Sequence, residues 1–138
     1  MRVQIFDTTL RDGSQGEGVN FSSDDKVKVA IALDKFGVDY IEGGWPGSNP
    51  KDIDFFRKIK NYKLEHAKIT AFGSTRRAKN PPDKDPNLLA LIESKTPVTT
   101  IFGKSWDFHV TDALRISLEK NLEMIEDTVA FLKSRGKE

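Results

Sequence analysis

The chain has 138 residues, enough for one domain with a buried core, and its 22 Lys and Arg nearly balance 21 Asp and Glu. This balance argues against a protein that binds nucleic acid, which normally carries a basic excess, and the absence of cysteine excludes disulfides and thiolate metal sites. No apolar run approaches the roughly 18 residues of a membrane span and no signal-peptide core begins the chain, so we expect a soluble, cytoplasmic protein.

Strand-like and helix-like segments alternate along the first half of the chain. Residues 3–6 are predicted to form a strand, and the glycine-containing stretch 13–18 is predicted to be a loop. A helix is expected to begin at Ser22, which has Asp25 at capping-box spacing, and to end at Gly37. A second strand follows over 39–44. The apolar stripe of the helix is expected to consist of Val27, Ala30, Ile31, Leu33 and Phe36.

The same alternation continues in the second half. A helix is expected to begin at Asn49, because Pro50 then occupies the favourable first helical position. The third strand is predicted at 67–72, a short helix around 88–92, and the fourth strand at 98–102. A last, long amphipathic helix is predicted from the spacing of Leu114, Leu118, Leu122, Ile125, Val129 and Leu132.

Four strand–helix units in strict alternation predict an α/β fold with a parallel sheet and right-handed crossovers. Alternation alone leaves two architectures open, a short doubly wound sheet and part of a barrel.

Chemistry-bearing side chains concentrate where the first strand ends. Residues 7–15 read Asp-Thr-Thr-Leu-Arg-Asp-Gly-Ser-Gln. Asp12 offers a hard oxygen ligand for a divalent metal, and Arg11 offers a planar fork of donors for a carboxylate. The alternative interpretation is a plain turn, in which Asp12 and Gly13 supply backbone freedom and Arg11 makes a surface ion pair.

The stretch 7–15 resembles the opening of the metal-dependent acyl-CoA condensing enzymes, the 2-isopropylmalate, homocitrate and citramalate synthases. Together with the hydroxymethylglutaryl-CoA lyases these form a superfamily of TIM-barrel metallolyases. The stretch 43–52, Gly-Gly-Trp-Pro-Gly-Ser-Asn-Pro-Lys-Asp, resembles the citramalate synthase version of its loop. The resemblance implies that residues 1–138 are a parallel (βα)4 half of a TIM (β/α)8 barrel, strands one to four with their helices. We therefore expect a fragment, with the rest of the barrel and a regulatory region absent.

The resemblance assigns roles to residues at the carboxyl ends of the strands. Asp12 matches the metal-ligating aspartate of the family, and Arg11 matches the arginine that polarises the keto acid and steadies the enolate oxygen. Glu42, at the end of the second strand, matches a glutamate thought to hold the arginine and metal-bound groups in place. The alternative interpretation is that Glu42 is a solvated acid in a turn.

Two further positions are expected to bind substrate. Gln15 matches a family carboxamide, and His109 matches a histidine that contacts the keto acid, although Trp106 stands where the family usually has serine. Arg76 and Arg77 follow the third strand and could face a carboxylate or the phosphates of CoA; simple solvation is the alternative.

The reaction implied by the resemblance is a Claisen-type condensation of acetyl-CoA with pyruvate, followed by thioester hydrolysis to citramalate. The implied cofactor is a divalent metal, Mg, Mn or Zn. The family holds this metal with a His-x-His pair that has no counterpart here, because the two histidines of the chain are His66 and His109. We therefore expect weak or no metal binding, and no catalysis by this chain alone.

Three alternatives remain open. The chain could come from a 2-isopropylmalate or homocitrate synthase, or from a lyase of the hydroxymethylglutaryl type. It could also be a self-associating half-barrel, because a four-stranded arc leaves its first and last strands as open edges. Two copies paired head to tail would rebuild eight strands, so a homo-oligomer is expected.

Overall fold

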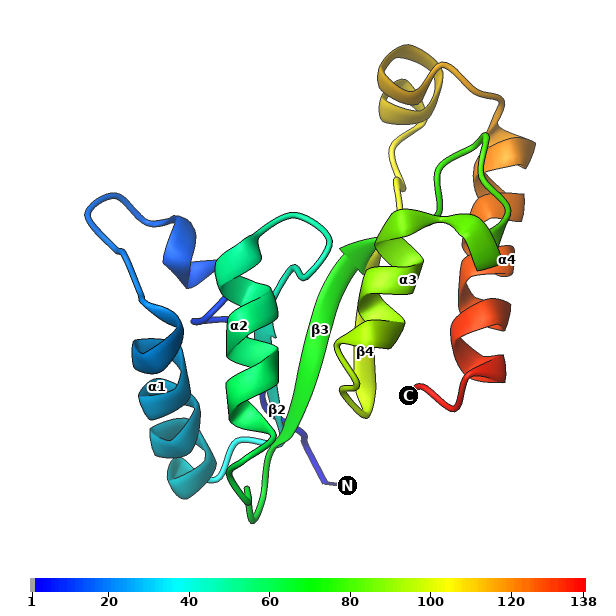
Figure 1. Ribbon diagram of the computed structural model, residues 1–138. Helices are drawn as coiled ribbons and strands as arrows, with labels where there is room; N and C mark the ends of the chain where they lie inside the picture. The colour runs from blue at the N-terminus through cyan, green and yellow to red at the C-terminus, as the bar shows by residue number, and fades with distance from the viewer. Residues whose placement is uncertain (1) are drawn as a thin grey trace.

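The computed structural model describes residues 2–138 as a four-stranded parallel sheet in the order β1-β2-β3-β4. The strands are β1 (Phe6–Asp7), β2 (Tyr40–Gly44), β3 (Lys68–Ser74) and β4 (Val98–Phe102). The helices α1 (Ser23–Phe36), α2 (Pro50–Ile59), α3 (Pro86–Glu93) and α4 (Leu118–Ser134) alternate with them (Figure 1). Three short helical turns, η1 (Gly13–Gln15), η2 (Pro82–Lys84) and η3 (His109–Leu114), lie in the loops. The predicted α/β architecture of four strand–helix units is confirmed. No helix in residues 2–138 is long and apolar enough to cross a membrane.

The two faces of the sheet differ, because successive strand residues point to opposite sides. Ile41, Ile69 and Ala71 face the helices and join one buried cluster with aromatic and leucine side chains of α2 and α3. The opposite face carries the stacked rings of Phe6 and Tyr40, whose centroids are 5.9 Å apart. It also carries a Thr70–Thr100 hydroxyl contact of 2.9 Å. In a closed barrel this second face would be the interior.

The last residue described, Glu138, lies against the outer edge of β4. Its backbone N–H donates to Pro97 O at 3.1 Å, and Thr99 N–H donates to Glu138 O at 2.9 Å. Its side chain accepts from Tyr40 Oη at 2.7 Å and from Lys68 Nζ at 2.5 Å. Glu138 therefore joins one edge of the sheet to β2 and β3 across the inner face.

The first strand–helix unit follows the prediction with two corrections. The strand predicted over 3–6 pairs with β2 at Phe6 and Asp7 instead, with Ile5 O accepting from the first β2 amides. The capping box of Ser22 and Asp25 is formed, and Gly37 ends α1 at a φ of 93°, as expected. Phe36, predicted to be buried, is 82% exposed. The buried side of α1 runs through Ala30 and Asp34, and residue 36 lies about 200° around the helix from residue 34.

The predicted stripe of the last helix is wrong in part. Leu114 belongs to η3, and α4 begins four residues later at Leu118. Leu122 and Val129 are 65% and 48% exposed, whereas Thr128 is fully buried. The Thr128 hydroxyl accepts from Arg76 N–H at 3.0 Å and donates to Met124 O at 2.6 Å. Because of this polar contact with the end of β3, the side of α4 that faces inward is the row Asn121, Met124, Thr128 and Leu132. The purely apolar row that the spacing predicts does not face inward as a whole.

Helix α2 approaches the end of β2 unusually closely. A Cβ added to Gly43 would lie 2.3 Å from the Phe55 ring, and one added to Gly44 would lie 2.3 Å from the Asp52 carboxyl carbon. The pairing register between β2 and β3 shifts between Glu42 and Gly44, as expected of a bulge. The two glycines thus allow the bulge and the helix to pack together.

A buried ion pair stabilises this junction. Lys26 of α1 and Asp52 of α2 are both 4% exposed and in direct contact. Lys26 Nζ also donates to Gly43 O at 3.1 Å, and the second Asp52 oxygen accepts from Trp45 N–H at 2.8 Å. The pair therefore connects α1, α2 and the backbone that follows Glu42.

We predict strong thermodynamic coupling between these two residues. Lys26→Met leaves the Asp52 charge buried without its cation, and should lower the free energy of unfolding by about 3–5 kcal/mol in urea titrations. Lys26→Met combined with Asp52→Asn removes both charges and keeps the acceptor for Trp45, so it should cost less than Lys26→Met alone. Lys120→Met, which breaks the exposed Lys120–Glu123 pair, is the control and should cost no more than about 1 kcal/mol. Equal losses in the buried and exposed single variants would contradict the prediction.

Candidate functional site

Arg11 projects from a tight loop after β1. Thr8 O accepts from the amides of Arg11, Asp12 and Gly13 at 3.2, 2.8 and 3.1 Å. Leu10 is completely buried between them and anchors the loop in the core. Residues 8–12 therefore form a turn between β1 and η1, in line with the alternative interpretation of this stretch, but the turn holds Arg11 in a defined position.

The Arg11 guanidinium is fixed on three sides. Its Nε donates to Glu42 Oε2 at 2.6 Å and its Nη1 to Asp12 Oδ1 at 2.9 Å, while its Cζ lies 4.1 Å from the centroid of the Phe72 ring. The Arg11 side chain is 22% exposed. Within residues 2–138, Nη2 makes no hydrogen bond. The Arg11 guanidinium is thus held in one orientation at the carboxyl end of the sheet, and its Nη2 can still donate a hydrogen bond.

Glu42 is a buried carboxyl, only 1% exposed, rather than the solvated acid of the alternative interpretation. Burial raises the pKa of Glu42 above its ordinary value, the hydrogen bond and charge of Arg11 oppose this, and the nearby Asp12 charge adds to it. The Arg11–Glu42 contact is thus the electrostatic centre of the site. Asp12, in contrast, is 61% exposed and keeps one oxygen free of Arg11.

The platform beneath Arg11 was missed by sequence reasoning. The Phe72 ring is contacted edge-on by Trp45, with centroids 5.4 Å apart. Trp45 Nε1 donates to Asn87 Oδ1 at 2.7 Å, and Asn87 Nδ2 donates to Ser74 O at 2.6 Å. Phe72 could have been noticed as the one aromatic residue near the end of the third strand, but no sequence pattern singles out Asn87. Trp45 thus connects Phe72 to the start of α3.

The structure does not bring all predicted site residues together. Gln15 is exposed in η1, one turn beyond Arg11. His109 begins η3 and packs edge to face against Trp106, with centroids 4.7 Å apart. Figure 1 shows η3 and the loop carrying Arg11 far apart above the sheet. Arg11, Asp12 and Glu42 therefore form the candidate site. Gln15 meets it only through its backbone, whose N–H donates to Asp12 O at 3.0 Å, and within residues 2–138 no side-chain hydrogen bond joins Gln15 or His109 to these three residues.

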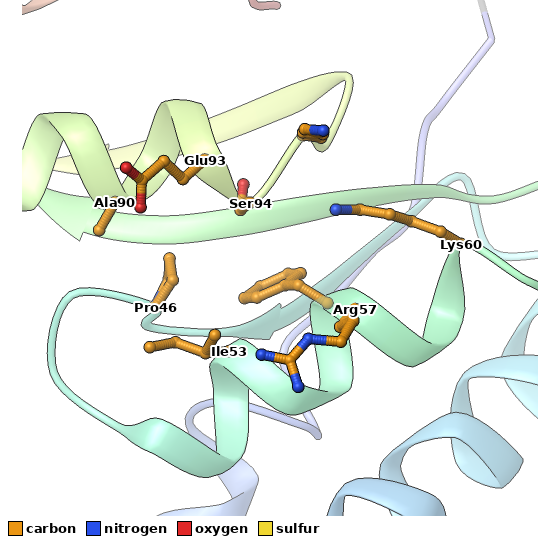
Figure 2. Close-up of a pocket in the computed structure, with 9 residues that line it drawn as sticks. Pro46, Ile53, Arg57, Lys60, Ala90, Glu93 and Ser94 are labelled. Carbon is orange, nitrogen blue, oxygen red and sulfur yellow. The ribbon is translucent and has the colours of Figure 1, made fainter.

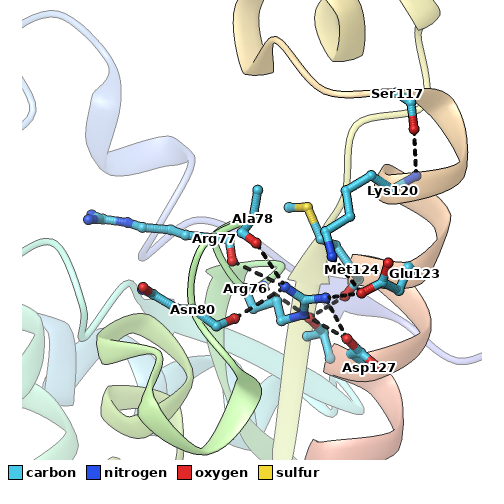
Figure 3. Close-up of polar contacts among 10 residues, drawn as sticks. Arg76, Arg77, Ala78, Asn80, Ser117, Lys120, Glu123, Met124 and Asp127 are labelled. Atoms are coloured by element: carbon cyan, nitrogen blue, oxygen red, sulfur yellow. Dashed lines mark hydrogen bonds and ion pairs between the residues drawn. The ribbon is translucent and has the colours of Figure 1, made fainter.

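Arg76 has a different environment from either sequence interpretation. It is 4% exposed, and its Nε and Nη2 donate to Asp127 at 2.8 and 2.5 Å, with a further bond from Nη2 to Glu123 at 2.9 Å. Its Nη1 contacts the backbone carbonyls of residues 77, 78 and 80 (Figure 3). Arg76 therefore links the loop after β3 to α4 through hydrogen bonds and ion pairs. Arg77 points away from this network and is exposed.

A cavity of about 450 Å³ opens beside Trp45 at the carboxyl ends of β3 and β4. Its walls combine apolar side chains with exposed Arg77 and with Lys104. Apolar walls with a few placed cations are typical of small-molecule sites.

Asp12 is the candidate ligand for the divalent metal that the family resemblance implies. Within residues 2–138, no group of three or more His, Asp or Glu side chains is placed to hold a metal ion. Asp12 supplies one exposed carboxylate, and divalent ions in proteins normally take several ligands. The described residues therefore do not make a complete metal site by themselves.

Comparison with known proteins settles the family. The family model described as HMGL-like matches residues 2–138. The chain belongs to the HMGL-like family. An (R)-citramalate synthase of Geobacter sulfurreducens is 61% identical over 132 residues, 96% of this chain and 25% of the relative. One from Aquifex aeolicus is 60% identical over the same shares. A 2-isopropylmalate synthase of Listeria welshimeri is 34% identical over 97% of this chain and 25% of its own length.

Solved HMGL-like structures share the fold. The Bacillus subtilis HMG-CoA lyase superposes with a TM-score of 0.72 at 20% identity, over 99% of this chain and 44% of that one. The Pseudomonas aeruginosa hydroxymethylglutaryl-CoA lyase gives 0.72 at 19% identity, over 98% and 43%. The predicted half of a TIM barrel is therefore confirmed. The chain spans about a quarter of the length of the curated relatives it matches.

We predict that Arg11 holds down the pKa of Glu42. The folded pKa lies above the ordinary value, so ionising Glu42 costs stability as the pH rises between its unfolded and folded pKa. Arg11→Met removes the opposing cation and leaves the burial, so the pKa should rise further.

The measurement is a ¹³C NMR titration of the Glu42 carboxyl, with thermal unfolding followed over the same pH range. Arg2→Met, which breaks an ion pair at the exposed Arg2, is the matched control and should leave the Glu42 titration unchanged. An unchanged pKa in Arg11→Met would show that the ion pair contributes nothing.

Proposed function

We propose that this chain supplies the first four strand–helix units, residues 1–138, of a citramalate synthase barrel. The whole protein would join acetyl-CoA to pyruvate and release citramalate and CoA. Two observations support the reaction class: an oriented Arg11 with an unoccupied Nη2, and 49–61% identity to (R)-citramalate synthases against 33–37% to 2-isopropylmalate synthases among the relatives compared.

Arg11 would stabilise the negative charge that develops on oxygen during condensation. The enolate carbon of the acetyl thioester attacks the keto carbon of pyruvate, the C=O π electrons move to oxygen, and a new C–C bond forms. A guanidinium preorganised by Glu42 and Phe72 can donate to that oxygen without reorganising first. Water then cleaves the thioester. Asp12 would hold the metal, while Gln15 and His109 would contact substrate from the rim.

The divalent metal implied by the family resemblance would polarise the keto group when bound. The described residues supply Asp12 as a ligand but not the further ligands that a metal ion needs. We therefore propose that this chain positions Arg11 and Asp12, and we assign it no step that depends on the ion. We accordingly expect the isolated chain to be inactive.

A chimera tests the proposal. This chain replaces the matching segment of the Geobacter sulfurreducens (R)-citramalate synthase, and CoA release is measured with acetyl-CoA and pyruvate. The chimera should be active, and Arg11→Lys should lower kcat by about 10²–10³ because a planar donor is lost. Arg2→Lys, at an exposed position, should leave kcat unchanged. A folded chimera that releases CoA with 3-methyl-2-oxobutanoate but not with pyruvate would favour the isopropylmalate alternative, and one inactive with both would contradict the proposal.

A second candidate is the self-associating half-barrel, favoured by the apolar side chains on the open sheet. Phe6 and Phe102, on the two outer strands, are 42% and 51% exposed. A second copy would cover them. Light scattering should then show a dimer that Phe6→Lys with Phe102→Lys converts to a monomer, whereas Phe36→Lys on the helical side should have no effect. A monomer at high concentration would exclude this candidate.

A further inference from the structure

A cavity of about 280 Å³ lies between α2 and α3, on the outer, helical side of the sheet. Its apolar walls come from Pro46, Ile53, Phe56 and Ala90. Figure 2 shows Lys60 extending from the end of α2 toward Ser94 at the end of α3. None of the side chains that contact Arg11 lines it. The cavity is therefore distinct from the candidate active site.

Three cations surround this cavity. Arg57 and Lys60 belong to α2 and its end, and Lys95 follows α3. Within residues 2–138 the amines of Lys60 and Lys95 have no ion-pair partner, and Arg57 has one exposed contact of 3.6 Å with Asp54. Burial lowers the pKa of Lys60, and the charges of Lys95 and Arg57 lower it further. The fold therefore gathers three like charges, of which Lys60 and Lys95 have no ion-pair partner within residues 2–138.

The backbone at Lys95 gives a second, independent observation. Its φ is +55°, a conformation that glycine adopts at little cost and that side chains with a Cβ rarely adopt. Its N–H caps α3 by donating to Ile92 O at 3.1 Å. A lysine at a position that favours glycine places an amine at the cavity at the expense of backbone strain, and such strain is typical of functional positions.

The volume of the cavity and the charge around it together indicate which class of ligand it can bind. A second cavity of about 230 Å³ shares Phe56, Lys60 and Lys95 with the first, which extends the room available. Among the side chains that line the cavity, three cations and the Glu93 carboxylate leave a surplus of two positive charges, while Asp54, the exposed partner of Arg57, lies outside the lining. A phosphate monoester carries about −1.5 to −2 near pH 7 and matches that surplus better than a monocarboxylate does.

We propose that this cavity is a binding site for a small organic phosphate monoester. The phosphate lies among Lys60, Lys95 and Arg57, and the apolar body of the ligand lies against Ile53, the exposed apolar wall of the cavity. The site is independent of the proposed condensation chemistry, because it opens on the helical side of the sheet rather than at the strand ends.

Phenyl phosphate tests the proposal, by calorimetric titration of the 138-residue chain and by shifts of backbone amides around the cavity. Saturable binding is expected, and Lys60→Gln and Lys95→Gly should each weaken it about tenfold. Lys95→Gly should also raise the melting temperature, because it relieves the backbone, so lost binding cannot reflect unfolding. Lys63→Gln makes the same change in net charge at an exposed position outside both cavities, and should leave affinity unchanged.

Two comparison ligands separate the contributions. Inorganic phosphate should bind more weakly than phenyl phosphate because it has no apolar body to place against Ile53, and benzyl alcohol should not bind. Absence of saturable phenyl phosphate binding at millimolar concentration, or an equal loss in Lys63→Gln, would overturn the proposal. Equal affinity for inorganic phosphate would overturn the role of Ile53, and equal affinity for benzyl alcohol would overturn the role of the cations.

Discussion

The buried contact between Lys26 and Asp52 is the interaction on which the site geometry depends. It ties two helices to the backbone of residues 43–45, and that backbone forms the bulge after Glu42. A buried ion pair often contributes little net stability, but it specifies one arrangement, because any other leaves a charge without its partner. Here the arrangement specified is the one that directs Glu42 at Arg11.

The placement of Arg11 follows from a chain of such contacts. Asn87 fixes the Trp45 ring, Trp45 packs on Phe72, and Phe72 supports the guanidinium that Glu42 orients. These residues come from β2, the loop after it, β3 and α3, so the position of one cation depends on several parts of the fold. When a guanidinium is preorganised in this way, the free energy needed to orient it is spent during folding, so it does not add to the barrier of the proposed reaction.

Local signals in the sequence were sufficient for the elements and for the central residues. Ser22, Gly37 and Pro50 marked helix boundaries that the structure retains, since caps depend on neighbouring residues only. Arg11 and Asp12 were singled out because residues 7–15 resemble a family motif, and Glu42 because it stands near the end of the second strand. Contacts between distant segments left no such signal: the burial of Arg76 depends on Asp127, 51 residues away, and the rotation of α4 depends on a threonine hydroxyl. Apolar periodicity misassigned Leu122 for that reason.

The contact between Glu138 and Tyr40 has a geometric consequence. Glu138 occupies the place of a neighbour to β4, three strand positions from β2, and these positions would be about 14 Å apart in a flat sheet. Side chains that stand perpendicular to a flat sheet do not meet over that distance, yet Tyr40 Oη and the Glu138 carboxylate are 2.7 Å apart. The strands must therefore already bend with a small radius within this chain. The curvature of a cylinder is in that case a property of its first four strands, and later strands continue an arc rather than impose one.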